Sequence, residues 1–265
     1  MNRMIQRLAW VAALLLATAG AQAQEHPRIM AVPTARDGVT QPVLFVTPAQ
    51  PWDTAVILFV GRGGQADVET HGTDGRGQNT LYRGLDILVR EGVAAAVVDP
   101  PSDRPSLWNY RNTADHADDI AHVIAALKQG GAKRVWLAGI SMGTLSAASI
   151  AQRLKTGGPD GIVMMSSIVN PNRESSETVL QIPLEEIAVP VLLIRNPGDG
   201  CRSSPPEGAD RILRQLDGAP VKRLMEFGGG GSSRGGPCEA LSAHGFIGQD
   251  EPLMTAVAGW IKNPN

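Results

Sequence analysis

The sequence has little net charge and only two cysteines. Its 24 basic and 26 acidic residues leave a formal net charge of −2. It therefore has neither the basic field that attracts nucleic acid nor a polyacidic tail, and we expect no nucleic-acid partner. Charge says nothing about the substrate of such a protein.

Long apolar runs are also missing, except near the N-terminus. Two arginines precede an apolar run over residues 8–19, and small residues follow it up to Ala23. This pattern predicts a secretory signal peptide over residues 1–23, cleaved after Ala23. A retained membrane anchor is the weaker interpretation, because a spanning helix needs roughly 20 apolar residues. We expect a secreted or periplasmic bacterial protein with no stable membrane anchor and, without a nearby cysteine, no lipid-modified N-terminus.

The rest of the chain, residues 24–265, has the length of a single α/β domain. Apolar strands are predicted over residues 29–33, 43–47, 56–60, 93–98, 134–138, 162–165, 191–194 and 221–227. Helices are predicted over residues 79–90, 113–129, 144–154, 206–217 and 252–262. Strands that alternate with helices predict a mostly parallel, twisted sheet with helices on both faces. A tight turn between the first two strands indicates an antiparallel edge.

The predicted helix over residues 113–129 has an apolar and an acidic face. Its apolar face carries Ile120, Val123, Ile124 and Leu127 at helical spacing, which predicts core positions. The other face carries Asp115, Asp118, Asp119 and His122. No pair among them has a recognised metal-ligand spacing, so we expect a solvated face and no bound metal.

A G-x-S-x-G motif at Gly139–Gly143 identifies Ser141 as a candidate nucleophile. The chain holds 30 glycines, and the motif occurs again around Ser233, so the motif alone is modest evidence. Ser141 lies between a predicted strand and a predicted helix, where a sharp turn lifts the hydroxyl above the sheet at a helix N-terminus. Ser233 has no helix after it. We therefore expect Ser141 to be the nucleophile and Ser233 to lie in a loop.

A serine nucleophile needs a base and a third group that orients the base. Asp199 lies just past the end of the strand over residues 191–194. Binding and active sites in open parallel sheets collect at these strand ends. His244 is the only histidine between the last predicted strand and the last helix; the others precede Asp199, at positions 26, 71, 116 and 122. Asp210 and Asp217 belong to the following helix. We expect Asp199 to be the acid and His244 the general base.

These three segments together resemble the nucleophile, acid and base positions of the α/β-hydrolase superfamily, over essentially the whole mature chain. The resemblance implies an α/β-hydrolase fold and a serine hydrolase that cleaves carboxylic esters through an acyl-enzyme intermediate. Thioester or peptide hydrolysis remains an alternative, as does a non-catalytic binding protein on the same scaffold. The sequence does not determine the oligomeric state.

The glycine-rich loop Val60–Gly64 is similar to the oxyanion loop of that superfamily. An acyl-transfer site needs two N–H groups aimed at the developing oxyanion. The resemblance implies that they come from Met142 and Arg62, with Gly63 as the alternative to Arg62. Many relatives have histidine where this chain has Val60. The same loop also fits a dinucleotide-binding pattern, but no helix opens after it and no acidic residue ends a strand about 20 residues later, so we expect no cofactor.

No large cap is predicted over the site. Residues 168–188, where many relatives insert a helical lid, are few and rich in turn residues. At most the loops over residues 69–79 and 100–112, the latter with Trp108 and Tyr110, should cover the site. An open site favours small-molecule or polymer-end esters. It resembles dienelactone-hydrolase-like proteins, which usually use a cysteine nucleophile that this chain lacks.

The only two cysteines, Cys201 and Cys238, are predicted to form a disulfide. An exported chain enters an oxidising compartment, where a matched pair is normally bonded. Cys201 lies two residues after Asp199, and Cys238 six residues before His244. If the acid and the base meet, the loops that carry the two thiols are already neighbours.

Overall fold

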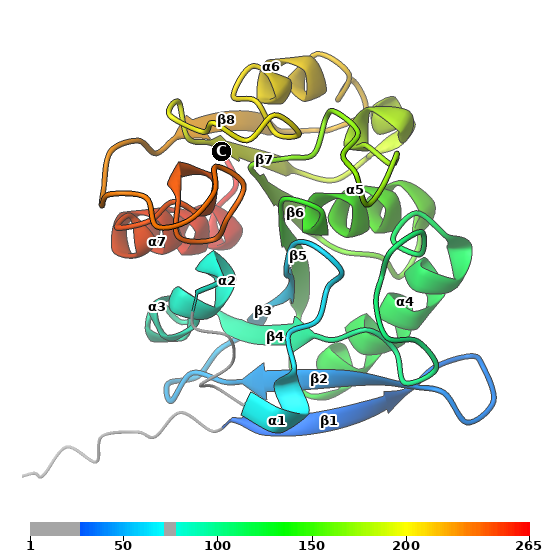
Figure 1. Cartoon of the computed structure of the whole chain (residues 1–265). Coiled ribbons are helices and arrows are strands. Elements are labelled where there is room, and N and C mark those ends of the chain that lie inside the picture. Colours follow the sequence, from blue (N-terminus) through cyan, green and yellow to red (C-terminus); the bar gives the residue numbers. More distant parts are fainter. Residues whose placement is uncertain (1–26, 72–77) are drawn as a thin grey trace, which may run out of the picture.

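The computed structural model describes residues 27–71 and 78–265 of the chain (Figure 1). The predicted signal peptide over residues 1–23 lies outside the described residues. Within the described part, no helix is both long enough and apolar enough to cross a membrane.

An eight-stranded sheet forms the centre of the molecule, in the order β1-β2-β4-β3-β5-β6-β7-β8. The strands are β1 (Arg28–Pro33), β2 (Thr40–Val46), β3 (Thr54–Phe59), β4 (Ala94–Val98), β5 (Arg134–Ile140), β6 (Gly161–Met165), β7 (Val191–Arg195) and β8 (Lys222–Glu226). The pairs β1–β2 and β2–β4 are antiparallel, and every later pair is parallel. The predicted parallel sheet with an antiparallel edge is confirmed.

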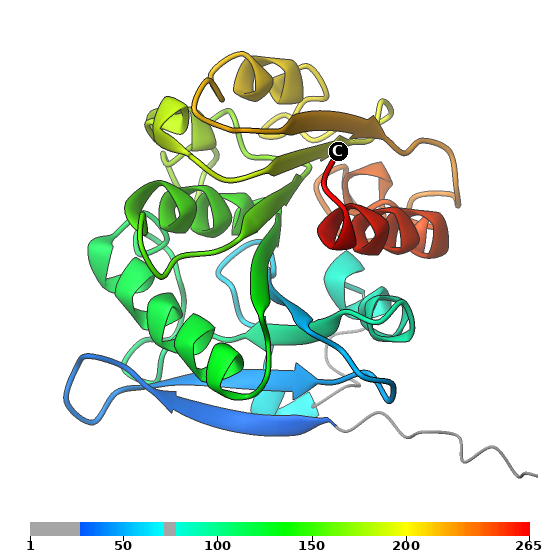
Figure 2. The same cartoon turned by 180° about the vertical axis from the view of Figure 1, so that it is seen from behind.

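Helices cover both faces of the sheet (Figures 1 and 2). One face packs against α4 (Ala114–Gln129), α5 (Gly143–Arg153) and α6 (Gly208–Leu213). The other packs against α2 (Thr80–Arg83), α3 (Leu85–Arg90) and α7 (Asp250–Lys262), and the short helix α1 (Val68–His71) lies beside β2. Central strands such as β3 are buried along their whole length, because both faces are covered. Their side chains form two apolar cores, one on each side of the sheet.

Two predicted helices differ from the structure by more than one or two residues at an end. The helix predicted over residues 79–90 is broken at Gly84 into α2 and α3. A Cβ on Gly84 would lie 2.2 Å from Met254 Cγ, so glycine here lets α7 approach closely. The helix predicted over residues 206–217 is shorter in the structure, where it is α6.

Residues 168–188 contain only the short 3₁₀ helices η2 (Val179–Gln181) and η3 (Leu184–Glu186), and no folded cap.

The prediction for the acidic face of α4 was wrong at one residue. Asp115, Asp118 and His122 are exposed, but Asp119 is buried. The Asp119 carboxylate accepts a 2.7 Å hydrogen bond from Tyr110 Oη and another from Arg36 Nη2 at 2.7 Å. Helical spacing places Asp119 beside exposed neighbours, whereas the β1–β2 turn and the loop before α4 cover it in the folded chain.

Candidate active site

Ser141 occupies the sharp turn between β5 and α5. Its φ angle is +56°, in the left-handed region that non-glycine residues rarely adopt. Its N–H donates to Met165 O at 3.0 Å, and its carbonyl accepts from Thr144 N at 3.0 Å and from Thr144 Oγ1 at 2.6 Å. The neighbouring strand and the first turn of α5 therefore hold the backbone in this conformation.

Close packing explains both glycines of the motif. A Cβ on Gly139 would lie 2.3 Å from Gly143 O, and a Cβ on Gly143 would lie 2.0 Å from Phe59 O. Any larger residue at either position would push α5 away from β3 and β5. Ser233, in the second copy of the motif, lies in an exposed loop outside any helix or strand, so its glycines meet no such crowding.

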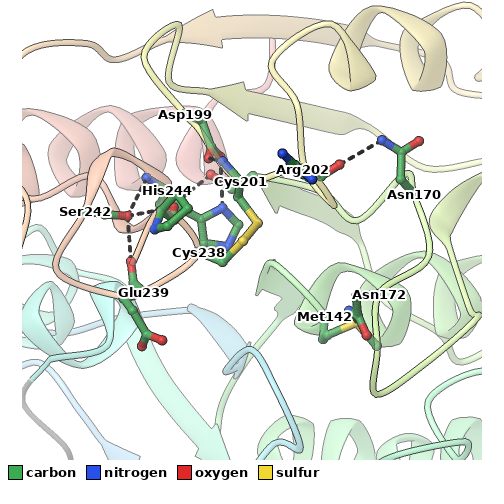
Figure 3. Close-up of a disulfide and its surroundings, with 12 residues drawn as sticks. Met142, Asn170, Asn172, Asp199, Cys201, Arg202, Cys238, Glu239, Ser242 and His244 are labelled. Carbon is green, nitrogen blue, oxygen red and sulfur yellow. Dashed lines mark hydrogen bonds and ion pairs between the residues drawn. A yellow bond between two sulfur atoms is a disulfide. The ribbon is translucent and has the colours of Figure 1, made fainter. Parts of the chain in front are cut away.

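Asp199 and His244 meet at the end of the sheet beyond β7. His244 Nδ1 lies 2.9 Å from Asp199 Oδ2, and Asp199 Oδ1 accepts a 2.9 Å hydrogen bond from the Cys201 N–H (Figure 3). Both side chains are buried, at 7% exposure for Asp199 and 3% for His244. A buried carboxylate on Nδ1 orients the imidazole and stabilises its protonated form.

The loop that carries His244 is held from several sides. It forms the 3₁₀ helix η4 (Ala243–Gly245), which Ser242 Oγ caps by accepting from the His244 N–H at 3.2 Å. Ser166 Oγ donates to His244 O at 2.8 Å, and Thr80 Oγ1 donates to Gly245 O at 2.6 Å. These bonds join η4 to the segment after β6 and to the start of α2, so the histidine position depends on two distant parts of the chain.

Ser141 and His244 line the same cavity, which has a volume of about 510 Å³. His244 Nε2 is buried and has no hydrogen-bond partner among residues 27–71 and 78–265. The structure thus brings the predicted acid and base into contact and places the predicted nucleophile in their cavity. It does not join Ser141 Oγ to His244 by a hydrogen bond. Such bonds are often long without substrate and tighten when it binds.

The loop after β3 lies against Ser141. A Cβ on Gly61 would lie 3.2 Å from Ser141 Cβ, so glycine allows this approach. Arg62 has a φ angle of +50° and lines the cavity, whereas Gly63 is buried and does not. In the described chain, neither the Arg62 N–H nor the Met142 N–H donates to a protein acceptor. Of the two residues, Arg62 lines the cavity, whereas Met142 is buried and does not line it.

The cavity rim differs from the expectation for the loop over residues 100–112. Neither Trp108 nor Tyr110 lines the cavity; Trp108 packs against the core, and Tyr110 is buried beside Asp119. Gln78 and Asn79, from the other expected loop, do line it, although residues 72–77 lie outside the described chain. An ion pair between Arg62 and Glu239 spans the rim from the loop after β3 to the segment before η4.

Cys201 and Cys238 form the expected disulfide, with an S–S distance of 2.05 Å (Figure 3). Cys201 is buried two residues after Asp199, and Cys238 lines the cavity. The bond therefore joins the acid loop to the segment that leads to His244.

Solved structures with the same architecture include two esterases and a dienelactone hydrolase. The esterase Est1E from Butyrivibrio proteoclasticus is 14% identical, with a TM-score of 0.60 over 88% of this chain and 97% of that chain. The Pyrococcus furiosus esterase Pf2001 is 15% identical, with a TM-score of 0.65 over 90% and 91%. A putative dienelactone hydrolase from Klebsiella pneumoniae is 14% identical, with a TM-score of 0.60 over 91% and 99%.

This chain has the α/β-hydrolase fold. No family model and no curated protein matches its sequence. On the α/β-hydrolase fold a catalytic triad follows the chain order serine, acid, histidine, which is the order of Ser141, Asp199 and His244 here.

A second polar cluster on this α/β-hydrolase fold was missed from the sequence. Ser146 Oγ lies 2.9 Å from His116 Nε2 and accepts a 2.9 Å hydrogen bond from Arg111 Nη1. Burial, with the positive charges of Arg111 and Arg104, lowers the pKa of His116 to about 3. Burial also lowers the pKa of Arg111 to about 9. Nothing in the local sequence distinguishes Arg111 from a surface arginine, so no sequence signal could have found this cluster.

Proposed function

We propose that this protein is a secreted serine hydrolase that cleaves carboxylic esters. Ser141 is the nucleophile, His244 the general base and Asp199 the acid that orients it. The observation that carries the proposal is the buried Asp199–His244 pair: His244 Nε2 has no partner in the described chain, and His244 lines the same cavity as Ser141. The names of the similar structures, esterases and a dienelactone hydrolase, support ester cleavage.

The reaction follows from these positions. His244 Nε2 accepts the Ser141 hydroxyl proton while Oγ attacks the ester carbonyl, and Asp199 stabilises the imidazolium that forms. The N–H groups of Arg62 and Met142 receive the oxyanion, close to the N-terminus of α5. His244 then gives its proton to the leaving alcohol. Water, activated by the same histidine, attacks the acyl-enzyme and releases the acid.

The cavity favours a small or polymer-end ester. No cap covers it among residues 27–71 and 78–265, and its lining includes the polar side chains of Arg62, Gln65, Gln78, Asn79 and Glu239. A long alkyl chain would find no enclosed apolar channel there. We expect p-nitrophenyl esters with C2 to C4 acyl groups to have a higher kcat/KM than the C12 ester, and a preference for C12 to C16 would contradict the uncapped site.

The predicted signal peptide over residues 1–23 and the single disulfide support export. Expression of the full chain in a bacterium with a periplasm should yield a product that begins at Gln24. Intact-mass measurement of the periplasmic fraction tests this. An unprocessed chain in the cytoplasm would contradict it.

Covalent labelling tests the proposed function directly. A fluorophosphonate probe should label the wild-type protein and the Ser233→Ala variant, but not Ser141→Ala, and hydrolysis of p-nitrophenyl acetate should follow the same pattern. Circular dichroism checks that all three proteins fold. A folded wild-type protein without labelling or turnover of ester, thioester and peptide substrates would favour a binding protein, and label on Ser233 would reject the chosen nucleophile.

A further inference from the structure

Arg111 is a charged side chain in an apolar interior. It lies in the segment before α4, is 0% exposed and forms no ion pair in the described chain. Burial of an unpaired cation carries a large desolvation penalty, and such a group persists only where hydrogen bonds replace the lost water. The bonds that Arg111 makes therefore indicate what it does in the folded chain.

The Arg111 guanidinium bonds to the loop after β3 and to the nucleophile helix. Nη2 donates to Val60 O at 3.0 Å and to Arg62 O at 3.0 Å. Nη1 donates to Ser146 Oγ at 2.9 Å, on α5 five residues after Ser141. One side chain thus links the loop that carries the Arg62 N–H to the helix that begins after the Met142 N–H.

Together with two backbone hydrogen bonds, these bonds hold all four carbonyls of the segment from Val60 to Gly63. Gly61 O accepts from the Gly64 N–H at 3.1 Å, and Gly63 O accepts from the Leu107 N–H at 2.7 Å. With the Val60 and Arg62 carbonyls on Arg111, four consecutive carbonyls are bonded. All the described peptide bonds are trans, so the N–H of each peptide points away from its carbonyl. The carbonyls therefore determine where the Arg62 N–H points.

The conformation held in this way is a strained one. Arg62 has a φ angle of +50°, in the left-handed region that is sterically unfavourable for a residue with a Cβ. The two peptides held by Arg111 lie on either side of the peptide that carries the Arg62 N–H. Without the guanidinium, the buried Val60 carbonyl and the partly buried Arg62 carbonyl would both lose this donor, and the loop would relax toward other conformations.

We propose that Arg111 is a positioning residue that directs the Arg62 N–H toward the oxyanion and fixes its position relative to Ser141. It does not touch the substrate. The inference rests on the proposed function, because an oxyanion site has meaning only if Ser141 attacks a carbonyl. Its effect should be confined to states in which negative charge develops on that oxygen.

The test replaces Arg111 with methionine and with lysine. Loss of one oxyanion donor typically costs about 10²–10³-fold in kcat. We expect Arg111→Met to lower kcat for p-nitrophenyl acetate by about 10²-fold, with KM within about threefold of wild type. Lysine restores a cation but has one nitrogen in place of two, so Arg111→Lys should lie between wild type and Arg111→Met.

Inhibitors separate positioning from general loss of structure. The serine hydroxyl adds to the carbonyl of an alkyl trifluoromethyl ketone, which places an oxyanion in the site. The matched methyl ketone binds mainly as an uncharged carbonyl. The Ki of the trifluoromethyl ketone should rise by the same factor by which kcat falls, with the Ki of the methyl ketone nearly unchanged. Leu127→Ala leaves a cavity in the core under α4 and serves as the destabilised control. It should keep wild-type kcat and Ki values.

Equal kcat and Ki values in Arg111→Met and wild type would overturn the inference, as would equal losses for both ketones. If Arg111→Met does not fold, Ser146→Ala removes only the acceptor of Nη1. It should lower kcat severalfold at constant KM, and no change in kcat would again overturn the inference. If the wild-type protein turns over the ester and Arg111→Met does so at the same rate, only the role of Arg111 is rejected. If the wild-type protein itself shows no turnover, the proposed function is rejected as well.

Discussion

Two buried histidines lie near serines at the start of α5, in opposite electrostatic surroundings. His244 has the Asp199 carboxylate on Nδ1, its Nε2 has no hydrogen-bond partner in the described chain, and the residue lines the same cavity as Ser141. His116 is within hydrogen-bond distance of Ser146 and close to the positive charges of Arg111 and Arg104.

The difference shows which features suit a histidine to base catalysis. A general base must hold the proton that it takes, and a carboxylate on the opposite nitrogen stabilises that state. Full burial and, after it, nearby cations do the reverse at His116, whose pKa falls to about 3. A serine hydrogen-bonded to a histidine is therefore insufficient. His116 and Ser146 form a structural pair, whereas our proposal assigns catalysis to His244 and Ser141.

Replacement of each histidine by glutamine should give the largest difference in activity between the two clusters. His244→Gln removes the base and should lower kcat/KM for p-nitrophenyl acetate by at least about 10⁴-fold. His116→Gln keeps an amide where Nε2 meets Ser146 and should change kcat/KM less than about threefold. Steady-state kinetics on both purified variants measures the contrast.

Circular dichroism and thermal melting are the controls for that experiment, since His116→Gln alters a buried position. A large loss of kcat/KM in a well-folded His116→Gln variant would assign a catalytic role to the second cluster. Near-normal kinetics in His244→Gln would reject His244 as the base.

The two clusters also differ in what holds them in place. Ser146 and His116 lie within α5 and α4, whereas Asp199 and His244 lie in loops joined by the Cys201–Cys238 disulfide. The bond closes a loop with a sequence separation of 37, worth about 4 kcal/mol in the chain-entropy model. The double variant Cys201→Ser/Cys238→Ser should unfold at lower urea concentration and have a lower kcat, because the acid and base loops lose their link.

Urea titration and kinetics at a temperature where the double variant stays folded measure the two effects separately. A fall in stability with unchanged kcat would mean that the bridge does not position the pair. Alkylation of two thiols in the native, periplasmically produced protein would show that the bond does not form there.

The pH dependence of stability should reveal the second cluster. His116 stays neutral in the folded chain down to about pH 3, but it binds a proton near its ordinary pKa of 6.5 when the chain unfolds. The unfolded state therefore binds more protons between these values, and stability falls as pH falls through this window by up to about 1.4 kcal/mol per pH unit. Between pH 7 and pH 5, wild type should lose about 2 kcal/mol more than His116→Gln.

Urea titrations at both pH values measure that difference. His122→Gln is the matched control, because His122 is exposed on the same helix and its replacement should leave the wild-type dependence intact. Parallel pH profiles for wild type and His116→Gln would show that His116 is not held neutral.

The sheet could be predicted from the sequence because its strands are continuous apolar runs between turn residues. Ser141, Asp199 and His244 could be proposed because each follows a predicted strand in an order that one known architecture uses. Asp119 and Arg111 could not be assigned in this way. Asp119 repeats the spacing of an exposed helix face, and its partners Arg36 and Tyr110 come from two other segments.

The sequence by itself determined the alternation of strands and helices, the turn at Ser141 and the order of the acid and base that follow it. These depend on local patterns, since glycines, apolar runs and turn residues act on their own segment of the chain. Only the tertiary structure decided which histidine faces a carboxylate and which faces a cation. Arg111 reaches Val60, Arg62 and Ser146 only after β3, α5 and the segment before α4 have packed together. A charge acts over a few ångströms in space, and no local pattern in the chain records that distance.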